Sequence, residues 1–176
     1  MNLISVESRL PREGDKEKNE MGTRNLTMVK LGGELKVAQY GQWDGYPTGQ
    51  GATISSFLKK MDKDLFISKV RRLRWITDQD IKAVESVGDK WEDLYPHLSR
   101  DEGAGVLDLI HDGNVDFVAG NKDFLEDGLF CEFAYELDLD SEVVTVFESG
   151  NQFKEIPFNE FTEELMERLE DELDKC

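Results

Sequence analysis

The sequence predicts an α+β fold in which a mostly antiparallel sheet, built from two β-hairpins, is covered by amphipathic helices. Three observations lead to this prediction. Two pairs of strand-like segments are each joined by a short turn, several other segments have apolar residues at helical spacing, and no apolar run approaches the roughly 20 residues of a membrane helix. Short links force antiparallel pairing, so the helices are left to cover the sheet.

The first hairpin is predicted over residues 26–40, where two strand-like runs flank Gly32 and Gly33. A Gly-Gly pair accepts the positive φ of a tight turn. The second hairpin is predicted from the runs 129–138 and 143–147, in which apolar and polar side chains alternate.

Helices are predicted where apolar residues recur every three or four positions. Thr77 and Asp80 have the spacing of a capping box, and Ser99 is positioned to cap a further helix. The predicted helices cover residues 52–61, 64–73, 81–87, a segment from Ser99 through Ile110, and 159–175.

The first 20 residues are mostly polar, contain a proline and a glycine, and lack a sustained apolar period. We therefore expect a flexible N-terminal arm over 1–20 and one α+β domain over 21–176. The arm has no apolar core of a secretory signal, and the two cysteines suit a reducing compartment, so a cytoplasmic location is expected.

Acidic residues are concentrated in the second half of the chain. The formal net charge is −17. Residues 1–88 hold 15 Lys and Arg against 12 Asp and Glu, whereas residues 89–176 hold 6 Lys and Arg against 26 Asp and Glu. Such a field repels nucleic acid and anionic lipid and favours a basic protein surface. The alternative is that the charge only keeps the protein soluble.

Two other charged or polar features have a plain explanation. The basic segment 69–74 could contact phosphates, but the many acids elsewhere can neutralise it, so direct nucleic-acid binding is not expected. His97 and His111 are too far apart for a typical zinc-site spacing, and we expect neither a metal nor a cofactor.

The stretch Tyr40–Gly51 (YGQWDGYPTGQG) is the strongest candidate for a ligand site. Glycines allow close approach of the backbone to a ligand, aromatic rings offer stacking faces, and a helix starting near Thr53 would direct free amides at the loop. The candidate ligand-binding residues are Arg24, Tyr40, Gln42, Trp43, Asp44, Tyr46 and Gln50. The alternative is that the aromatic residues and Pro47 close one end of the core.

The predicted C-terminal helix is the strongest candidate for a partner surface. Phe161, Leu165, Leu169 and Leu173 lie at four-residue spacing, and most of the other positions are acidic. The candidate partner-binding residues are Glu163, Glu164, Glu167, Glu170 and Asp171.

Two segments carry a resemblance. GTRNLT at 22–27, followed by KVAQYGQWDGYP at 36–47 and GQG at 49–51, resembles the opening of a family of small uncharacterised proteins of phages, bacteria and fungi. LFCEFAYELDLD at 129–140 resembles the second block that these proteins share. The resemblance implies a shared fold, an origin on a mobile element and a family-like start at Met21, and it carries no activity to transfer.

Two hypotheses of function follow. In the first, the chain is a non-catalytic interaction protein, encoded by a phage, whose acidic surface engages a basic, nucleic-acid-binding host protein. In the second, the loop 40–51 makes it a nucleotide-binding or small-molecule-binding module or a hydrolase.

Overall fold

The computed structural model describes residues 22–126 and 131–175. The predicted N-terminal arm, residues 1–20, lies outside the described residues. So do Leu129 and Phe130, the first two residues of the predicted strand 129–138.

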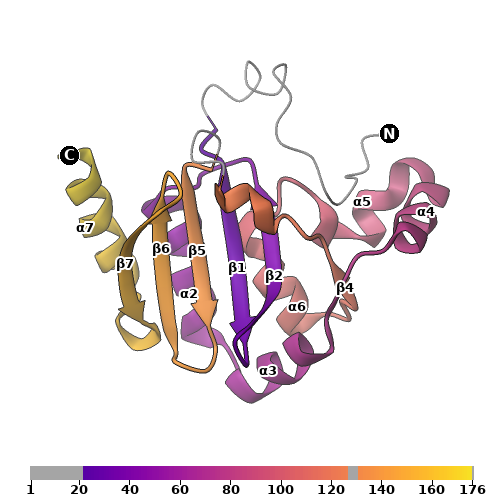
Figure 1. Cartoon of the computed structure of the whole chain (residues 1–176), viewed down its shortest axis with the longest axis horizontal. Helices are drawn as coiled ribbons and strands as arrows, with labels where there is room; N and C mark the ends of the chain where they lie inside the picture. The colour runs from indigo at the N-terminus through magenta and orange to yellow at the C-terminus, as the bar shows by residue number, and fades with distance from the viewer. Residues whose placement is uncertain (1–21, 127–130, 176) are drawn as a thin grey trace.

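A five-stranded sheet forms the centre of the molecule (Figure 1). Its strands lie side by side in the order β2-β1-β5-β6-β7, and only the β1–β5 pair is parallel. The strands are β1 (Asn25–Leu31), β2 (Glu34–Gly41), β5 (Phe133–Asp138), β6 (Val143–Glu148) and β7 (Asn151–Pro157). The prediction of an α+β fold with a mostly antiparallel sheet is confirmed.

Strands β1 and β2 are joined by Gly32 and Gly33, whose φ values are +60° and +77°. These values lie in the left-handed region that glycine enters without steric cost, so the chain can reverse within two residues. Thr27 of β1 is then paired with Gln39 of β2, and on its other side with Tyr135 of β5.

The strand β7 was not predicted. Its sequence, NQFKEIP, contains two charged residues and a proline, and a register shift interrupts its pairing with β6. These features belong to an edge strand, where unpaired backbone groups face away from the sheet and proline is tolerated. Ser149 and Gly150, with φ of +48° and +80°, form the turn that leads into it.

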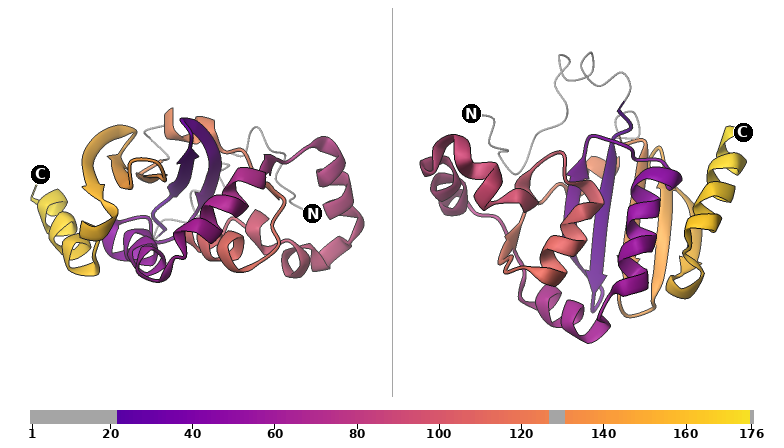
Figure 2. Two further views of the ribbon diagram at one scale, coloured as in Figure 1. Left: turned by 90° about the horizontal axis from the view of Figure 1, so that it is seen from below. Right: turned by 180° about the vertical axis from the view of Figure 1, so that it is seen from behind.

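The helices are distributed unevenly about the sheet. Figure 2 shows α2, α3 and α6 on one face, α7 at the β7 end of this layer, and α4 with α5 beyond β2. The helices are α2 (Ala52–Lys60), α3 (Lys63–Arg72), α4 (Asp78–Ser86), α5 (Trp91–Leu94), α6 (Val106–Asp112) and α7 (Glu163–Asp174).

Shorter elements connect these helices and strands. A two-stranded parallel sheet pairs β3 (Arg74–Trp75) with β4 (Phe117–Val118). A π-helical turn, η1 (Pro47–Gly51), runs directly into α2. The remaining turns are 3₁₀-helical: η2 (Gly88–Lys90), η3 (Pro96–Leu98), η4 (Gly103–Gly105), η5 (Lys122–Glu126) and η6 (Phe158–Glu160).

The helix predicted from Ser99 begins later than its capping signal suggests. The Ser99 hydroxyl accepts a hydrogen bond from the Asp101 amide at 3.2 Å, which closes a turn, and α6 starts only at Val106. Gly103 has a φ of +50°, which breaks the right-handed helical path between them. The capping box of α4 is present as predicted: Thr77 and Asp80 cap each other's backbone amides.

The core lies mainly between the sheet and its helices. Phe57 of α2, Phe66 of α3 and Ile110 of α6 pack there with Val29 and Tyr135 of the sheet, and all five are almost fully buried. Burying one such side chain contributes about 1.5–3 kcal/mol.

Candidate functional site

The candidate loop, residues 40–51, leaves β2 and enters η1 and α2. Asp44 has a φ of +53°, a left-handed conformation that a short polar side chain tolerates. The Gln50 amide donates to the Asp44 carbonyl at 2.7 Å, and a Cβ on Gly49 would lie 2.1 Å from that same carbonyl oxygen. The loop therefore folds tightly on itself, and only glycine fits at position 49.

The backbone of the loop is also tied to the sheet. The Gly45 amide donates to the Thr23 carbonyl at 2.9 Å. The buried Tyr135 hydroxyl donates to the Gly45 carbonyl at 2.7 Å. Because these bonds run to the segment just before β1 and to β5, the loop has a fixed position over the end of the sheet.

Side-chain amides hold the loop as well. Asn25 and Gln50 each donate from their side-chain amide to the Trp43 carbonyl, both at 3.0 Å. The Gln50 side-chain oxygen accepts from the Ala104 amide at 2.8 Å, which links the loop to η4. Gln50, a predicted ligand-binding residue, therefore uses both ends of its amide inside the protein.

Asp101 joins two more of the predicted residues. Its Oδ1 accepts hydrogen bonds from the Gln42 side-chain amide and from Trp43 Nε1, the latter at 2.7 Å. Asp101 lies in the turn before η4, far from the loop in sequence, and we did not single it out from the sequence. The acidic residues that follow Ser99 are the only signal that points to it.

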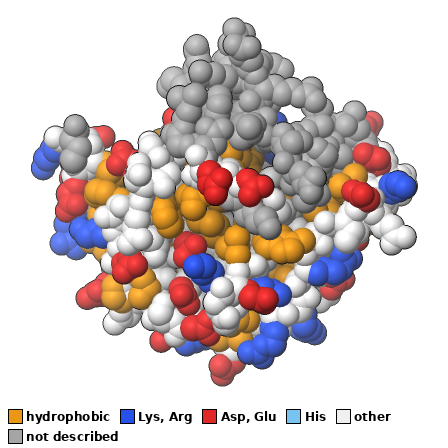
Figure 3. Space-filling view, viewed as in Figure 1, with side chains coloured by type: hydrophobic (Ala, Val, Ile, Leu, Met, Phe, Trp, Pro, Cys, Tyr) orange, Lys and Arg blue, Asp and Glu red, His pale blue; other side chains and the backbone are white. Residues whose placement is uncertain are grey.

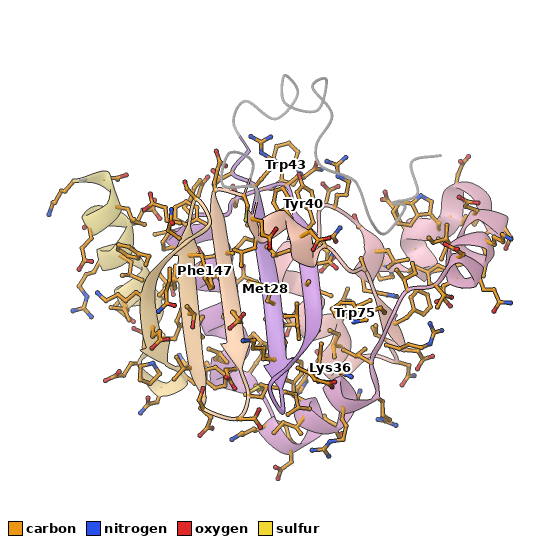
Figure 4. The ribbon with its side chains drawn as sticks, in the orientation of Figure 1. Met28, Lys36, Tyr40, Trp43, Trp75 and Phe147 are labelled. Carbon is orange, nitrogen blue, oxygen red and sulfur yellow. The ribbon has the colours of Figure 1, made fainter. Side chains whose placement is uncertain are left out.

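Arg24 and Tyr40 lie deeper than the other predicted residues. Arg24 is only 7% exposed, and its backbone amide donates to Glu132 Oε2 at 2.9 Å. Tyr40 packs edge-on against Phe124 at 5.0 Å, and the Arg100 guanidinium lies 5.2 Å from its ring centroid. Figure 4 shows Trp43 beyond Tyr40, toward the end of the sheet.

Three side chains of the loop face solvent to different degrees. Trp43 is 37% exposed, Asp44 is exposed, and Tyr46 is partly buried. The Tyr46 hydroxyl donates to Asp44 Oδ1 at 3.1 Å, and burial, followed by this carboxylate, raises the Tyr46 pKa. A raised pKa keeps the hydroxyl protonated at neutral pH, so it acts as a hydrogen-bond donor and not as a base.

The start of the helix behind the loop is occupied by a carboxylate of the protein. The amide and the hydroxyl of Thr48, in the first turn of η1, both donate to Glu170 Oε2, the amide at 2.9 Å. Negative charge is favourable at this end of a helix, where backbone amides lack partners. Glu170 therefore supplies the negative charge at the start of η1 from within the protein.

The five predicted partner-binding residues do not share one face of α7. Met166 and Leu169 are buried, and partly buried Glu170 turns toward η1. The acidic face of α7 is formed by four exposed side chains: Glu163, Glu164, Glu167 and Asp171. Thr162 caps the helix by accepting from the Leu165 amide at 3.2 Å.

A groove between α2 and the start of α7 was not predicted from the sequence. It has a volume of about 340 Å³, and we call it the α2–α7 groove. Partly buried Leu58 and Phe158 and buried Phe161 supply its apolar surface. Its polar lining residues are Ser55, Ser56, Lys59, Asn159, Thr162, Glu163 and Glu164.

A second groove, of about 380 Å³, lies where β2 begins, and Lys36 and Trp75 on its lining are labelled in Figure 4. Its two cations already have partners. Lys36 Nζ donates to the Leu73 carbonyl at 3.0 Å, and Arg74 forms a bidentate pair with Asp80 at 2.6 and 2.9 Å. The charge of Arg74 is therefore compensated by Asp80, whereas Lys36 is held by a neutral carbonyl.

Figure 3 shows the face of the sheet that lies opposite α2, α3 and α6. Apolar side chains gather there in a band across the centre of the view. Figure 4 shows Met28 and Phe147 on this face; Met28 is buried in a cluster with Phe124 of η5, and Phe147 is partly buried. Glu136 is the cross-strand partner of Met28 and so lies on the same face, where it forms an ion pair with Lys30 at 3.4 Å.

Within residues 22–126 and 131–175, no group of three or more His, Cys, Asp or Glu side chains is placed to hold a metal ion. None of the helices in the same part of the chain is both long enough and apolar enough to cross a bilayer.

Comparison of the chain with protein-family models, with curated proteins and with solved structures finds no match.

Proposed function

We propose that this chain is a non-catalytic interaction protein whose acidic face on α7 binds a basic protein surface. The observation that carries the proposal is the division of α7 into two faces. Met166 and Leu169 are buried against the rest of the protein, whereas Glu163, Glu164, Glu167 and Asp171 remain exposed. Charges arranged in this way steer a complementary basic surface and set its orientation.

The geometry of the loop 40–51 also supports a non-catalytic role. Gln42, Gln50 and Trp43 donate hydrogen bonds to Asp101 or to the backbone, and Glu170 occupies the start of the helix. These contacts favour the interpretation of the loop as a closure of the core. The proposed partner is a cytoplasmic nucleic-acid-binding protein of a host, since such proteins have extended basic surfaces. A host is chosen because the resemblance to small proteins of phages, bacteria and fungi implies an origin on a mobile element.

A pull-down with immobilised protein tests the proposal. We expect basic proteins to be retained at low salt and released at about 0.5 M salt, where the screening length falls to a few ångströms. A variant with Glu163→Gln, Glu164→Gln, Glu167→Gln and Asp171→Asn should no longer retain these proteins. Nuclease treatment should leave their retention by the wild-type protein unchanged.

The matched control removes the same number of exposed acids elsewhere, by Glu85→Gln, Asp89→Asn, Glu92→Gln and Asp93→Asn on and around α4 and α5. Equal losses in both variants, or retention that ignores salt, would contradict a role for the acidic face of α7.

A ligand-binding role for the loop is the second candidate. It is favoured by Trp43 and Asp44, which are exposed on a backbone held by hydrogen bonds and so are preorganised for a ligand. A thermal-shift screen with nucleotides and metabolites tests it, because a ligand at a hundred times its Kd stabilises the fold by about 2.7 kcal/mol. A hit must disappear in Trp43→Ala and Asp44→Ala while both variants remain folded; a screen without any shift would exclude this candidate for the compounds used.

A further inference from the structure

We propose that the α2–α7 groove receives an apolar side chain of the basic partner, while Glu163 and Glu164 bind a cation next to it. This inference rests on the proposed function, because it assigns the anchoring point of that same interaction. It adds a requirement that charge alone does not impose, namely that the partner segment carries a leucine-sized residue beside its basic residues.

The first argument is the chemistry of the groove. Leu58 of α2 and Phe158 of η6 line the groove and are only partly buried. Phe161, in the link from η6 to α7, also lines it and is buried. Its volume of about 340 Å³ is at the lower end of the range for ligand pockets, which suits one or two side chains better than a large molecule. Partner side chains that enter such a pocket supply most of the energy of an interface.

The second argument is the charge at the two edges of the groove. Glu163 and Glu164, in the first turn of α7, are exposed, and no ion pair involves either of them among the residues that the structure describes. The opposite edge carries Ser56 and Lys59 of α2. A basic residue of the partner is therefore attracted to the α7 edge and repelled from the α2 edge, which orients the segment across the groove.

The third argument is continuity with the acidic face of α7. Glu163 and Glu164 belong both to the groove and to this face, which continues along the helix through Glu167 and Asp171. A segment anchored in the groove can therefore extend its further basic residues along α7. The apolar anchor would determine how long the complex lasts, whereas the exposed charges would mainly determine how fast it forms.

Fluorescence anisotropy with two labelled peptides tests the inference. Both peptides are arginine-rich; one has a central pair of leucines, and the other has serines at those positions. We expect the wild-type protein to bind the leucine peptide about tenfold more tightly than the serine peptide, because burial of at least one of the two leucines in the groove favours binding.

Two variants change the groove in different ways. Leu58→Ser removes apolar surface but also weakens packing, so Ser56→Phe provides a second variant at an exposed position, where a bulky ring obstructs the groove without loss of core contacts. Each should reduce affinity for the leucine peptide to about that of the serine peptide. Leu94→Ser, at a 59% exposed leucine of α5, is the matched control and should have no effect.

The outcomes separate this inference from the function on which it rests. If both peptides bind equally and Ser56→Phe changes nothing, while Glu163→Gln with Glu164→Gln weakens both, the acidic face of α7 is the binding surface and the anchoring role of the groove is wrong. If neither peptide binds at low salt, the proposed function itself is contradicted.

Discussion

His97 is the clearest case of a single residue whose environment controls its chemistry. It is 6% exposed, and its ring lies 5.4 Å from that of Phe117 and 6.3 Å from that of Tyr95. Burial lowers the pKa of His97 to about 4, from an ordinary value of 6.5. The imidazole therefore stays neutral in the folded protein at pH values where it would be charged in the unfolded chain.

This shift makes stability depend on pH. His97 binds a proton below about pH 6.5 in the unfolded chain but only near pH 4 in the folded protein. The free energy of unfolding should therefore fall by up to about 3 kcal/mol as the pH is lowered from 6.5 to 4. Urea denaturation across this range measures the change. In His97→Phe the decrease over the same range should be smaller by that amount; an unchanged pH dependence would contradict a neutral, buried His97.

Glu170 provides a second test at the residue scale. Its carboxylate accepts from the Thr48 amide and hydroxyl and so holds α7 against the first turn of η1. Glu170→Gln weakens two charge-assisted hydrogen bonds and should lower the free energy of unfolding by about 1–2 kcal/mol. Glu167→Gln, exposed on the same helix, is the control and should stay within about 0.5 kcal/mol of the wild type.

At the scale of elements, α4 depends on one acidic residue for both its start and its connection to β3. Asp80 accepts from the Thr77 amide at 2.8 Å and forms the bidentate pair with Arg74. The Arg74 guanidinium holds the pKa of Asp80 far below its usual range.

Asp80→Asn should therefore destabilise the fold by about 1–2 kcal/mol, because the capping box and the ion pair are weakened together. Arg74 is half exposed, so solvent screening limits the contribution of the ion pair. Asp78→Asn, in the same first turn but exposed, separates this effect from the general preference of a helix start for acids. Equal destabilisation by the two substitutions would show that Asp80 has no special role.

Elements that depend on local sequence were predictable, and those that depend on distant partners were not. The Gly32-Gly33 turn and the capping box of α4 each involve residues a few positions apart. The parallel pairing of β1 with β5 joins segments separated by most of the helices, and no local pattern encodes it. The β7 strand was missed because its edge position permits charged residues and a proline.

The same distinction applies to the candidate site. Composition singled out the loop 40–51, but it could not show that Asp101, Ala104, Tyr135 and Glu170 would use its hydrogen-bonding groups. The amphipathic pattern of α7 predicted an acidic surface, yet only the packing shows that Glu170 turns inward. The α2–α7 groove needs Leu58 and Phe158 to meet, and they are a hundred residues apart in the chain.

For the whole molecule, the question is whether its acidity acts locally or only as a net charge. The second half of the chain holds 26 Asp and Glu against 6 Lys and Arg, and these acids include both the acidic face of α7 and exposed residues near α5. A diffuse field would attract any cation regardless of which acids are removed. A binding surface depends on the particular acids that contact the partner.

The most direct test is the salt dependence of affinity for the arginine-rich leucine peptide. It is measured for the wild type, for the variant with the acidic face of α7 neutralised, and for the variant with the four acids of α4 and α5 neutralised. The acidic face of α7 should account for most of the dependence, so its neutralisation should flatten the plot of log Kd against log salt concentration, while the α4–α5 variant keeps the wild-type slope. Equal flattening in both variants would show that only the net charge matters, and would contradict the account of α7 as a binding surface.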